Sequence, residues 1–148
     1  MLNVSIRDVF ASVYGLAPCR RGSASTELVL LMPLLASMLL GAAEYGMVIY
    51  SYSAMQFGAN RVARTVAVNR MTPAQAQTEV RNYVPGWVRD DISVSVSQTA
   101  PTDANTNLVQ VRLSVPAQQA TPLAILTRFV PWQLTANVAM KQELPYVD

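Results

Sequence analysis

The chain contains no histidine and only one cysteine, and charged residues make up 14% of its 148 residues. The missing histidine removes the commonest metal ligand and the usual Ser-His-Asp and Cys-His arrangements of nucleophilic catalysis. The lone Cys19 excludes an intrachain disulfide. The net charge of +2 comes from scattered basic residues, which argues against a nucleic-acid partner. We therefore expect neither an enzyme nor a protein that binds a metal, another cofactor or nucleic acid.

What the sequence does have is a long uncharged stretch near its N-terminus. Glu27 stands between Arg20-Arg21-Gly22 and 16 uncharged, mostly apolar residues, Leu28–Ala43. An acidic residue costs roughly 2.5–3.5 kcal/mol at the middle of a membrane helix and less toward the interface, so it persists where a partner or the headgroup layer accommodates it. We interpret residues 1–22 as a leader and residues 23–50 as a membrane-spanning helix.

Residues 23 to about 69 are predicted to form one helix, because no proline follows Pro33 and good helix formers are frequent. From Glu27 to Glu44 such a helix spans about 25 Å, close to the roughly 30 Å hydrocarbon core, so the two carboxylates are expected near opposite faces of a bilayer. Pro33 removes one backbone hydrogen bond and is expected to kink the first turns. Two small-residue pairs would allow another helix to approach closely: Ser37/Gly41 and Ala42/Gly46.

The second half of this helix is predicted to be amphipathic. Apolar residues recur there every three or four positions, at Val48, Tyr52, Met55, Ala59, Val62 and Val66. Arg61 and Arg64 are candidate contacts to lipid phosphates or to the acidic groups of a partner, although a solvated helix face is the favoured interpretation. The apolar stripe needs a partner, which the rest of the chain can supply.

The C-terminal part is predicted to form a small α+β domain, residues 51–148. Thr72-Pro73-Ala74-Gln75 reads as a capping box that starts a helix ending near Tyr83. Three segments then alternate apolar and polar residues, which predicts a three-stranded antiparallel sheet with one apolar face: 92–97, 109–115 and 132–140. A longer connection, residues 116–131, is expected to hold a short helix at Leu123–Phe129. The fold class is therefore α+β, a long helix packed on a small sheet.

One short motif partly fits a calcium-binding loop, but we do not predict a metal site there. Asp103, Asn105 and Asn107 have the alternate spacing that opens a calcium loop. The glycine expected at the sixth position is Leu108, and the bidentate glutamate expected at the twelfth is Ser114. We expect an Asx-rich hairpin turn at this position instead.

The N-terminal pattern resembles the signal of type IV prepilins, in which a prepilin peptidase cuts after a glycine and a glutamate is fifth in the mature chain. Here a cut between Gly22 and Ser23 would make Glu27 the fifth residue. The further order Glu27, Pro33, Gly41, Glu44 and Gly46, followed by Ala59-Asn60-Arg61 and Ala63-Arg64, is similar to the TadE-like pseudopilins (minor pilins) of the tight-adherence, or Flp, type IVc pilus system. The chain departs from that pattern at Asn60–Arg64, which lacks a Glu and a Gly, and at Met47, where an Arg often stands.

The resemblance implies a pilin-like fold and a role in assembling a pilus used for surface attachment. The implied partners are the prepilin peptidase, the major Flp pilin, a sister pseudopilin, the inner-membrane assembly platform and membrane lipid. The implied location is the bacterial inner membrane, crossed once, with the N-terminus cytoplasmic and the C-terminal domain periplasmic or extracellular. Glu27, Pro33 and Glu44 would then be the residues used in assembly, with Glu27 paired to the new amino group of Ser23 on a neighbouring subunit.

Two alternatives remain open at this stage. Gly41-Ala42-Ala43 is a passable signal-peptidase site before Glu44, which would release a soluble exported domain. An uncut helix would instead leave a single-pass anchor with an extracytoplasmic binding module outside any pilus. The N-terminal residue of the mature protein distinguishes the three possibilities. It would be Ser23 for the pseudopilin and Glu44 for the exported domain, and the leader would be intact for the uncut anchor.

Overall fold

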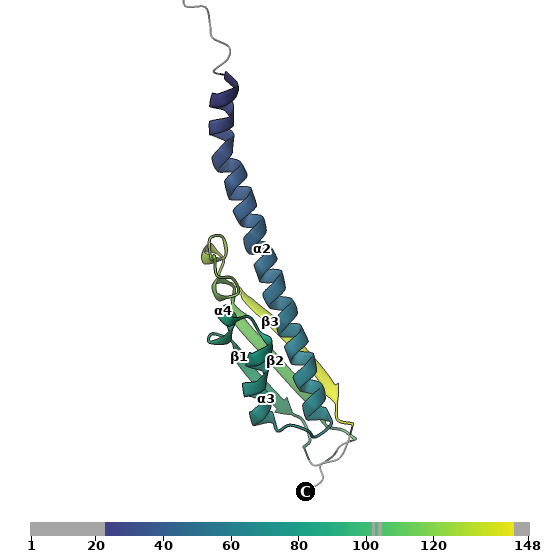
Figure 1. The fold of residues 1–148 in the computed structure, drawn as a ribbon. Coiled ribbons are helices and arrows are strands. Elements are labelled where there is room, and N and C mark those ends of the chain that lie inside the picture. The colour runs from purple at the N-terminus through teal and green to yellow at the C-terminus, as the bar shows by residue number, and fades with distance from the viewer. Residues whose placement is uncertain (1–22, 102, 104, 144–148) are drawn as a thin grey trace, which may run out of the picture. The chain divides into compact units, whose positions relative to one another are not determined.

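The α+β class is confirmed by the computed structural model, which describes residues 23–101, 103 and 105–143 (Figure 1). The elements in chain order are α2 (Ser23–Ala67), α3 (Pro73–Glu79), the 3₁₀ helix η2 (Val80–Tyr83), α4 (Gly86–Arg89), β1 (Ser93–Gln98), β2 (Leu108–Pro116), the 3₁₀ helices η3 (Ala117–Gln119) and η4 (Thr127–Phe129), and β3 (Gln133–Lys141). The chain divides into two compact units, Met1–Leu39 and Leu40–Asp148. The predicted leader lies outside the described residues. The predicted end of the membrane-spanning segment at residue 50 stays a prediction.

The long predicted helix is confirmed as α2, which continues through Pro33 and ends at Ala67. Its end is set by Asn69, whose φ of 58° lies in the left-handed region that asparagine tolerates better than most residues. The backbone N–H of Arg70 then donates to the carbonyl of Thr65 at 3.0 Å, which satisfies a carbonyl left over at the helix end.

The capping box at the start of α3 is also confirmed. The Thr72 hydroxyl accepts from the backbone N–H of Gln75, and the Gln75 side chain accepts from the backbone N–H of Thr72. The helix was expected to reach Tyr83 as a regular α-helix, but it tightens to 3₁₀ geometry from Val80 onward. Val84 is extended because Pro85 follows it and excludes the helical region for the preceding residue. The short α4 after Pro85 has no periodic signal in sequence.

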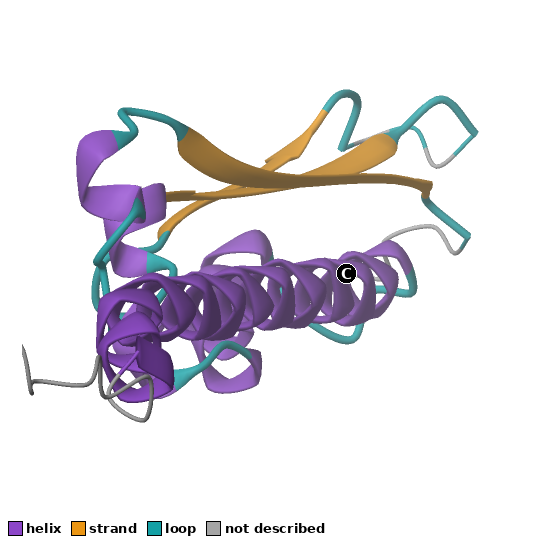
Figure 2. Ribbon diagram, turned by 90° about the horizontal axis from the view of Figure 1, so that it is seen from above, coloured by secondary structure: helices purple, strands orange, loops and turns teal. Residues whose placement is uncertain are grey.

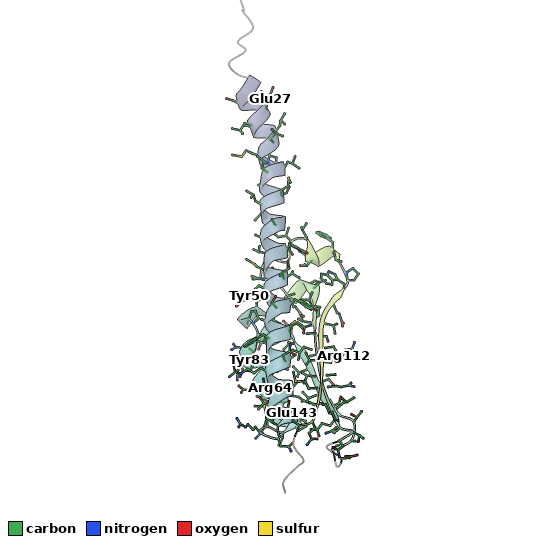
Figure 3. The ribbon with its side chains drawn as sticks, turned by 90° about the vertical axis from the view of Figure 1, so that its right-hand side faces the viewer. Glu27, Tyr50, Arg64, Tyr83, Arg112 and Glu143 are labelled. Atoms are coloured by element: carbon green, nitrogen blue, oxygen red, sulfur yellow. The ribbon has the colours of Figure 1, made fainter. Side chains whose placement is uncertain are left out.

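The three strands form one antiparallel sheet in the order β1-β2-β3, as the alternation predicts. Val111 of β2 lies opposite Val96 of β1 and Val138 of β3, so the apolar residues of all three strands share one face. Arg112, the next residue in β2, is exposed on the other face (Figure 3). The alternation therefore fixes both the pairing register and the face that is buried.

The hydrophobic core lies between this apolar face and the part of α2 that belongs to the second unit (Figure 2). Met55, Ala59, Val62 and Val66 of the predicted stripe are at most 1% exposed, and burying a side chain of the Val or Met type stabilises the fold by about 1.5–3 kcal/mol. The stripe prediction is wrong for Tyr52, which is 42% exposed. Trp132, predicted to open the apolar face of the third strand, precedes β3 and is 45% exposed.

Candidate anchoring and assembly site

Glu27 lies in the first turns of α2, and its side chain is exposed (Figure 3). The predicted cleavage site is only partly within the described residues, because Gly22 lies outside them and α2 begins at Ser23. Pro33 lies farther along the same helix and is also exposed. The assembly roles of Glu27 and Pro33 stay predictions.

The side chains that follow Glu27 form an apolar surface with no cover from the described residues of the chain. Large apolar residues of this segment are 47–77% exposed: Leu28, Val29, Leu30, Leu31, Met32, Leu34, Leu35, Met38, Leu39 and Leu40. Within the described residues, this helix is the single one that is long and apolar enough to cross a membrane. The exposure and the composition are compatible with a helix that crosses a membrane once.

Glu44 differs from Glu27, because the fold buries it to 1% exposure. One carboxylate oxygen accepts the backbone N–H of Leu126 at 2.7 Å. The other accepts the backbone N–H of Thr127 at 3.0 Å and the Thr127 hydroxyl at 2.7 Å. An ionised carboxylate can only accept hydrogen bonds, and the three converging donors occupy most of its roughly four acceptor positions. The sequence placed Glu44 near a bilayer face with a role in assembly; both stay predictions, but its intramolecular cradle was missed.

The donors come from residues 120–132, a segment between η3 and β3 that we name the apolar loop. Its shape depends on Ala124, which has a φ of 46° although it is not glycine. The loop passes so close to α2 that a Cβ added at Gly41 would lie 3.1 Å from Leu126 Cδ1. Gly41, expected to offer a small surface to another helix, therefore accommodates the chain's own loop. Gly46 of the other small-residue pair has no described atom within 4 Å of an added Cβ.

A second polar contact ties the start of the apolar loop to α2. The buried Ser51 hydroxyl donates to the carbonyl of Ala120 at 2.6 Å. The indole N–H of Trp87 reaches both Ser51 Oγ and the Ala120 carbonyl at 3.2 Å. Ser51 was not among the predicted site residues, although its spacing in the apolar stripe, three residues after Val48, is a signal for burial.

Arg61 and Arg64 are both exposed on the part of α2 that belongs to the second unit. Arg64 is labelled in Figure 3. Arg61 places its guanidinium 5.2 Å from the ring centre of Tyr83, and Phe57 meets the same ring edge-on at 6.0 Å between centroids. A cation over an aromatic ring contributes about 0.5–1 kcal/mol at an exposed site. Arg61 therefore has an intramolecular contact besides solvent, and contacts of either arginine to a partner stay a prediction.

Aromatic side chains line a groove beside the start of β3. Its volume is about 420 Å³, and its lining residues are Tyr45, Val48, Ile49, Tyr52, Trp132, Gln133, Leu134 and Thr135. The groove brings Tyr45 and Tyr52 of α2 together with Trp132, which lies eighty residues or more away in sequence. Trp and Tyr are the residues enriched at membrane–water interfaces.

The hairpin between β1 and β2 has the Asx geometry expected from its sequence. One Asp103 oxygen accepts the backbone N–H of Asn105 at 2.9 Å, and the other accepts the Thr106 hydroxyl at 2.8 Å. Asn107 is buried and donates from Nδ2 to Gln142 Oε1 at 2.6 Å. Across the described residues, no three His, Cys, Asp or Glu side chains are grouped so that they could hold a metal ion.

The fold and the exposed apolar helix define an α+β protein whose longest helix supplies both a candidate membrane anchor and one layer of the core. The model of the TadE-like protein family matches residues 22–64, which confirms the resemblance over nearly all of α2. The match associates the chain with tight-adherence pili. No curated protein and no solved structure matches the chain.

Proposed function

We propose that this chain is a membrane-anchored pseudopilin that acts in assembling a tight-adherence (Flp, type IVc) pilus used for surface attachment. The observation that carries the proposal is the family match over residues 22–64, which spans Glu27, the apolar segment and the first part of the core helix. The role is structural rather than catalytic, and no cofactor takes part. Cleavage after Gly22 by a prepilin peptidase, with the N-terminus in the cytoplasm and the sheet outside, belongs to the same proposal.

Glu27 has a physical role in this scheme. A cut before Ser23 exposes an α-amino group that is mostly charged at neutral pH, since its ordinary pKa is about 7.7–8.0. An amine of a neighbouring subunit within about 4 Å of Glu27 gains on the order of 4 kcal/mol at an effective dielectric near 20, before desolvation costs. Such a pair fixes the axial register of one subunit against the next. The neighbour is the major pilin or a sister pseudopilin, gathered at the inner-membrane platform.

The alternative of an exported domain cut before Glu44 has less support. Such a cut would remove Gly41, against which Leu126 packs. It would also make Glu44, which accepts hydrogen bonds from the apolar loop, the first residue of the chain. An uncut anchor with a binding module keeps those contacts, and the N-terminal residue of the mature chain separates it from the pseudopilin.

Replacing Glu27 tests the proposed role. We expect Glu27→Ala to insert in the membrane at a normal level and to lower surface pilus by at least about tenfold, the factor that corresponds to losing 1.4 kcal/mol of the register contact. The readout is major pilin sheared from the cell surface, with membrane level and N-terminal processing of the variant measured in parallel. Glu143→Ala is the matched control, because Glu143 is an exposed acid in the second unit, beyond β3. A Glu27→Ala variant that is inserted and processed and still gives normal surface pilus would contradict the proposal.

A further inference from the structure

The apolar loop exposes an unusual concentration of large apolar side chains. Six of its residues are 38–81% exposed: Leu123, Ile125, Leu126, Phe129, Val130 and Trp132. Single exposed apolar residues are ordinary on protein surfaces, but a contiguous group marks a contact with an apolar partner. Phe129, at 81%, is the most exposed of them. The loop therefore presents a surface that the second unit itself does not cover.

The place where the loop is attached indicates which partner it meets. Leu126 lies against Gly41, and the backbone N–H groups of Leu126 and Thr127 bind Glu44. Gly41 is in the last turn of the apolar run that ends at Ala43, and Glu44 follows directly. The loop, yellow-green in Figure 1, is thus fixed beside α2 where the lipid-compatible part of the helix ends.

The residues around the attachment point are those found where hydrocarbon meets water. Trp132, at the end of the loop, shares a groove with Tyr45 and Tyr52 of α2. Arg128 is exposed within the loop, between the buried Thr127 and the exposed Phe129. Aromatic rings with a polar tip and long basic side chains favour this layer, because each has an apolar body and a polar end.

We propose that the apolar loop is a second membrane contact, which inserts into the leaflet at the C-terminal end of the span. Phe129 and its apolar neighbours enter the boundary between headgroups and acyl chains, about 5–10 Å deep as interfacial segments do, and Arg128 reaches lipid phosphate. The inference rests on the proposed single-pass anchoring of α2. Insertion of the loop also explains why donors of the loop bind Glu44. Without them, a carboxylate near the hydrocarbon region would be poorly solvated.

Lipid is the occupant favoured by continuity with the anchor. The loop is fixed to the helix at the end of the apolar run, so the bilayer that covers Leu40 and Ala43 also reaches the loop. A protein neighbour is the competing occupant, and the test below distinguishes it.

Depth-dependent fluorescence quenching of the full chain in phosphatidylcholine and phosphatidylglycerol vesicles tests the inference. Single cysteines replace Phe129, Leu35 or Leu108 in a Cys19→Ser background and carry an environment-sensitive NBD group. The vesicles contain lipids with a nitroxide either near the headgroup or deep in the acyl chain. Leu35 reports the span itself, and Leu108, an exposed apolar residue at the start of β2 beside the hairpin turn, is the matched control.

We expect the label at position 129 to lose about half of its emission to the shallow nitroxide and less to the deep one, as an interfacial depth requires. The label at position 35 should be quenched most by the deep nitroxide, and the label at position 108 by neither. Quenching at 35 without quenching at 129 would overturn the loop insertion and leave the anchor intact, and a cross-link from 129 to a second copy would then identify a protein neighbour. No quenching at 35 would overturn the anchoring and the loop insertion together.

Discussion

At the residue scale, Glu44 shows most clearly what the sequence can and cannot provide. Its position after an uncharged run marks it as a residue that needs a partner. The partners are two backbone N–H groups and a hydroxyl more than eighty positions away, at Leu126 and Thr127. Backbone donors carry no sequence signature, so only the structure identifies them.

Replacing Glu44 should release the apolar loop from α2. Glu44→Ala leaves three donors without their acceptor, and buried groups left unsatisfied cost about 1–3 kcal/mol each. We therefore expect the free energy of unfolding to fall by at least about 3 kcal/mol. Urea unfolding in detergent micelles measures the loss, and amide hydrogen exchange locates it at residues 126 and 127. Glu44→Gln should lose less, because one oxygen still accepts. Unchanged hydrogen exchange at both amides in Glu44→Ala would contradict their hydrogen bonds to Glu44.

Asp103 should titrate at an unusually low pH. The Thr106 hydroxyl, followed by the backbone N–H of Asn105, lowers the pKa of Asp103 below its ordinary value by binding the ionised carboxylate. Because the folded-state pKa is the depressed one, the stabilisation is complete above the unfolded value near pH 4 and is lost as the pH falls through the folded value. NMR titration of the Asn105 and Thr106 amides measures the midpoint. A midpoint at or above about 4, or the same titration in Asp103→Asn, would contradict the assignment.

At the element scale, periodicity predicts most of the architecture. The capping box at Thr72, the alternation of the three strands and the apolar stripe of α2 are all local patterns. The capping box marks the start of a helix, and the alternation and the stripe indicate which face each element buries. The change from α to 3₁₀ geometry at Val80, the short α4 and the path of the apolar loop depend on packing and on single prolines. They have no periodic signal, and the sequence does not predict them.

The corrected stripe of α2 makes a quantitative prediction. Met55 is 0% exposed and Tyr52 is 42% exposed, although both fit the same period. Met55→Ala should lower the free energy of unfolding by roughly 2–5 kcal/mol, since it removes a core side chain and leaves a cavity. Tyr52→Ala should cost about 1 kcal/mol or less, because it removes a partly exposed ring and one hydrogen bond from Gln56.

Denaturant unfolding of the two variants in the same detergent provides the comparison. Equal losses for Met55→Ala and Tyr52→Ala would place Tyr52 in the core after all and contradict the packing of α2 on the sheet.

At the scale of the whole molecule, the sequence places one helix in two environments. The apolar residues of Leu28–Ala43 are exposed, and their composition is compatible with lipid as the surrounding medium. Farther along, the stripe from Val48 to Val66 is buried against the chain's own sheet except at Tyr52. The change from a nearly continuous apolar run to a stripe every three or four residues marks the transition, so this division can be predicted. The packing of the apolar loop against this part of α2 cannot be predicted from the sequence, because it depends on tertiary contacts at Gly41 and Glu44.

The central claim is that α2 is the assembly helix of a processed pseudopilin, and the N-terminal residue of the mature protein tests it most directly. The protein should be purified from native membranes and its N-terminus determined by Edman sequencing or by intact mass. We predict that it begins at Ser23, which makes Glu27 the fifth residue and supplies the cationic amine that pairs with it. A mature chain that begins at Glu44, or one that keeps residues 1–22, would contradict the account.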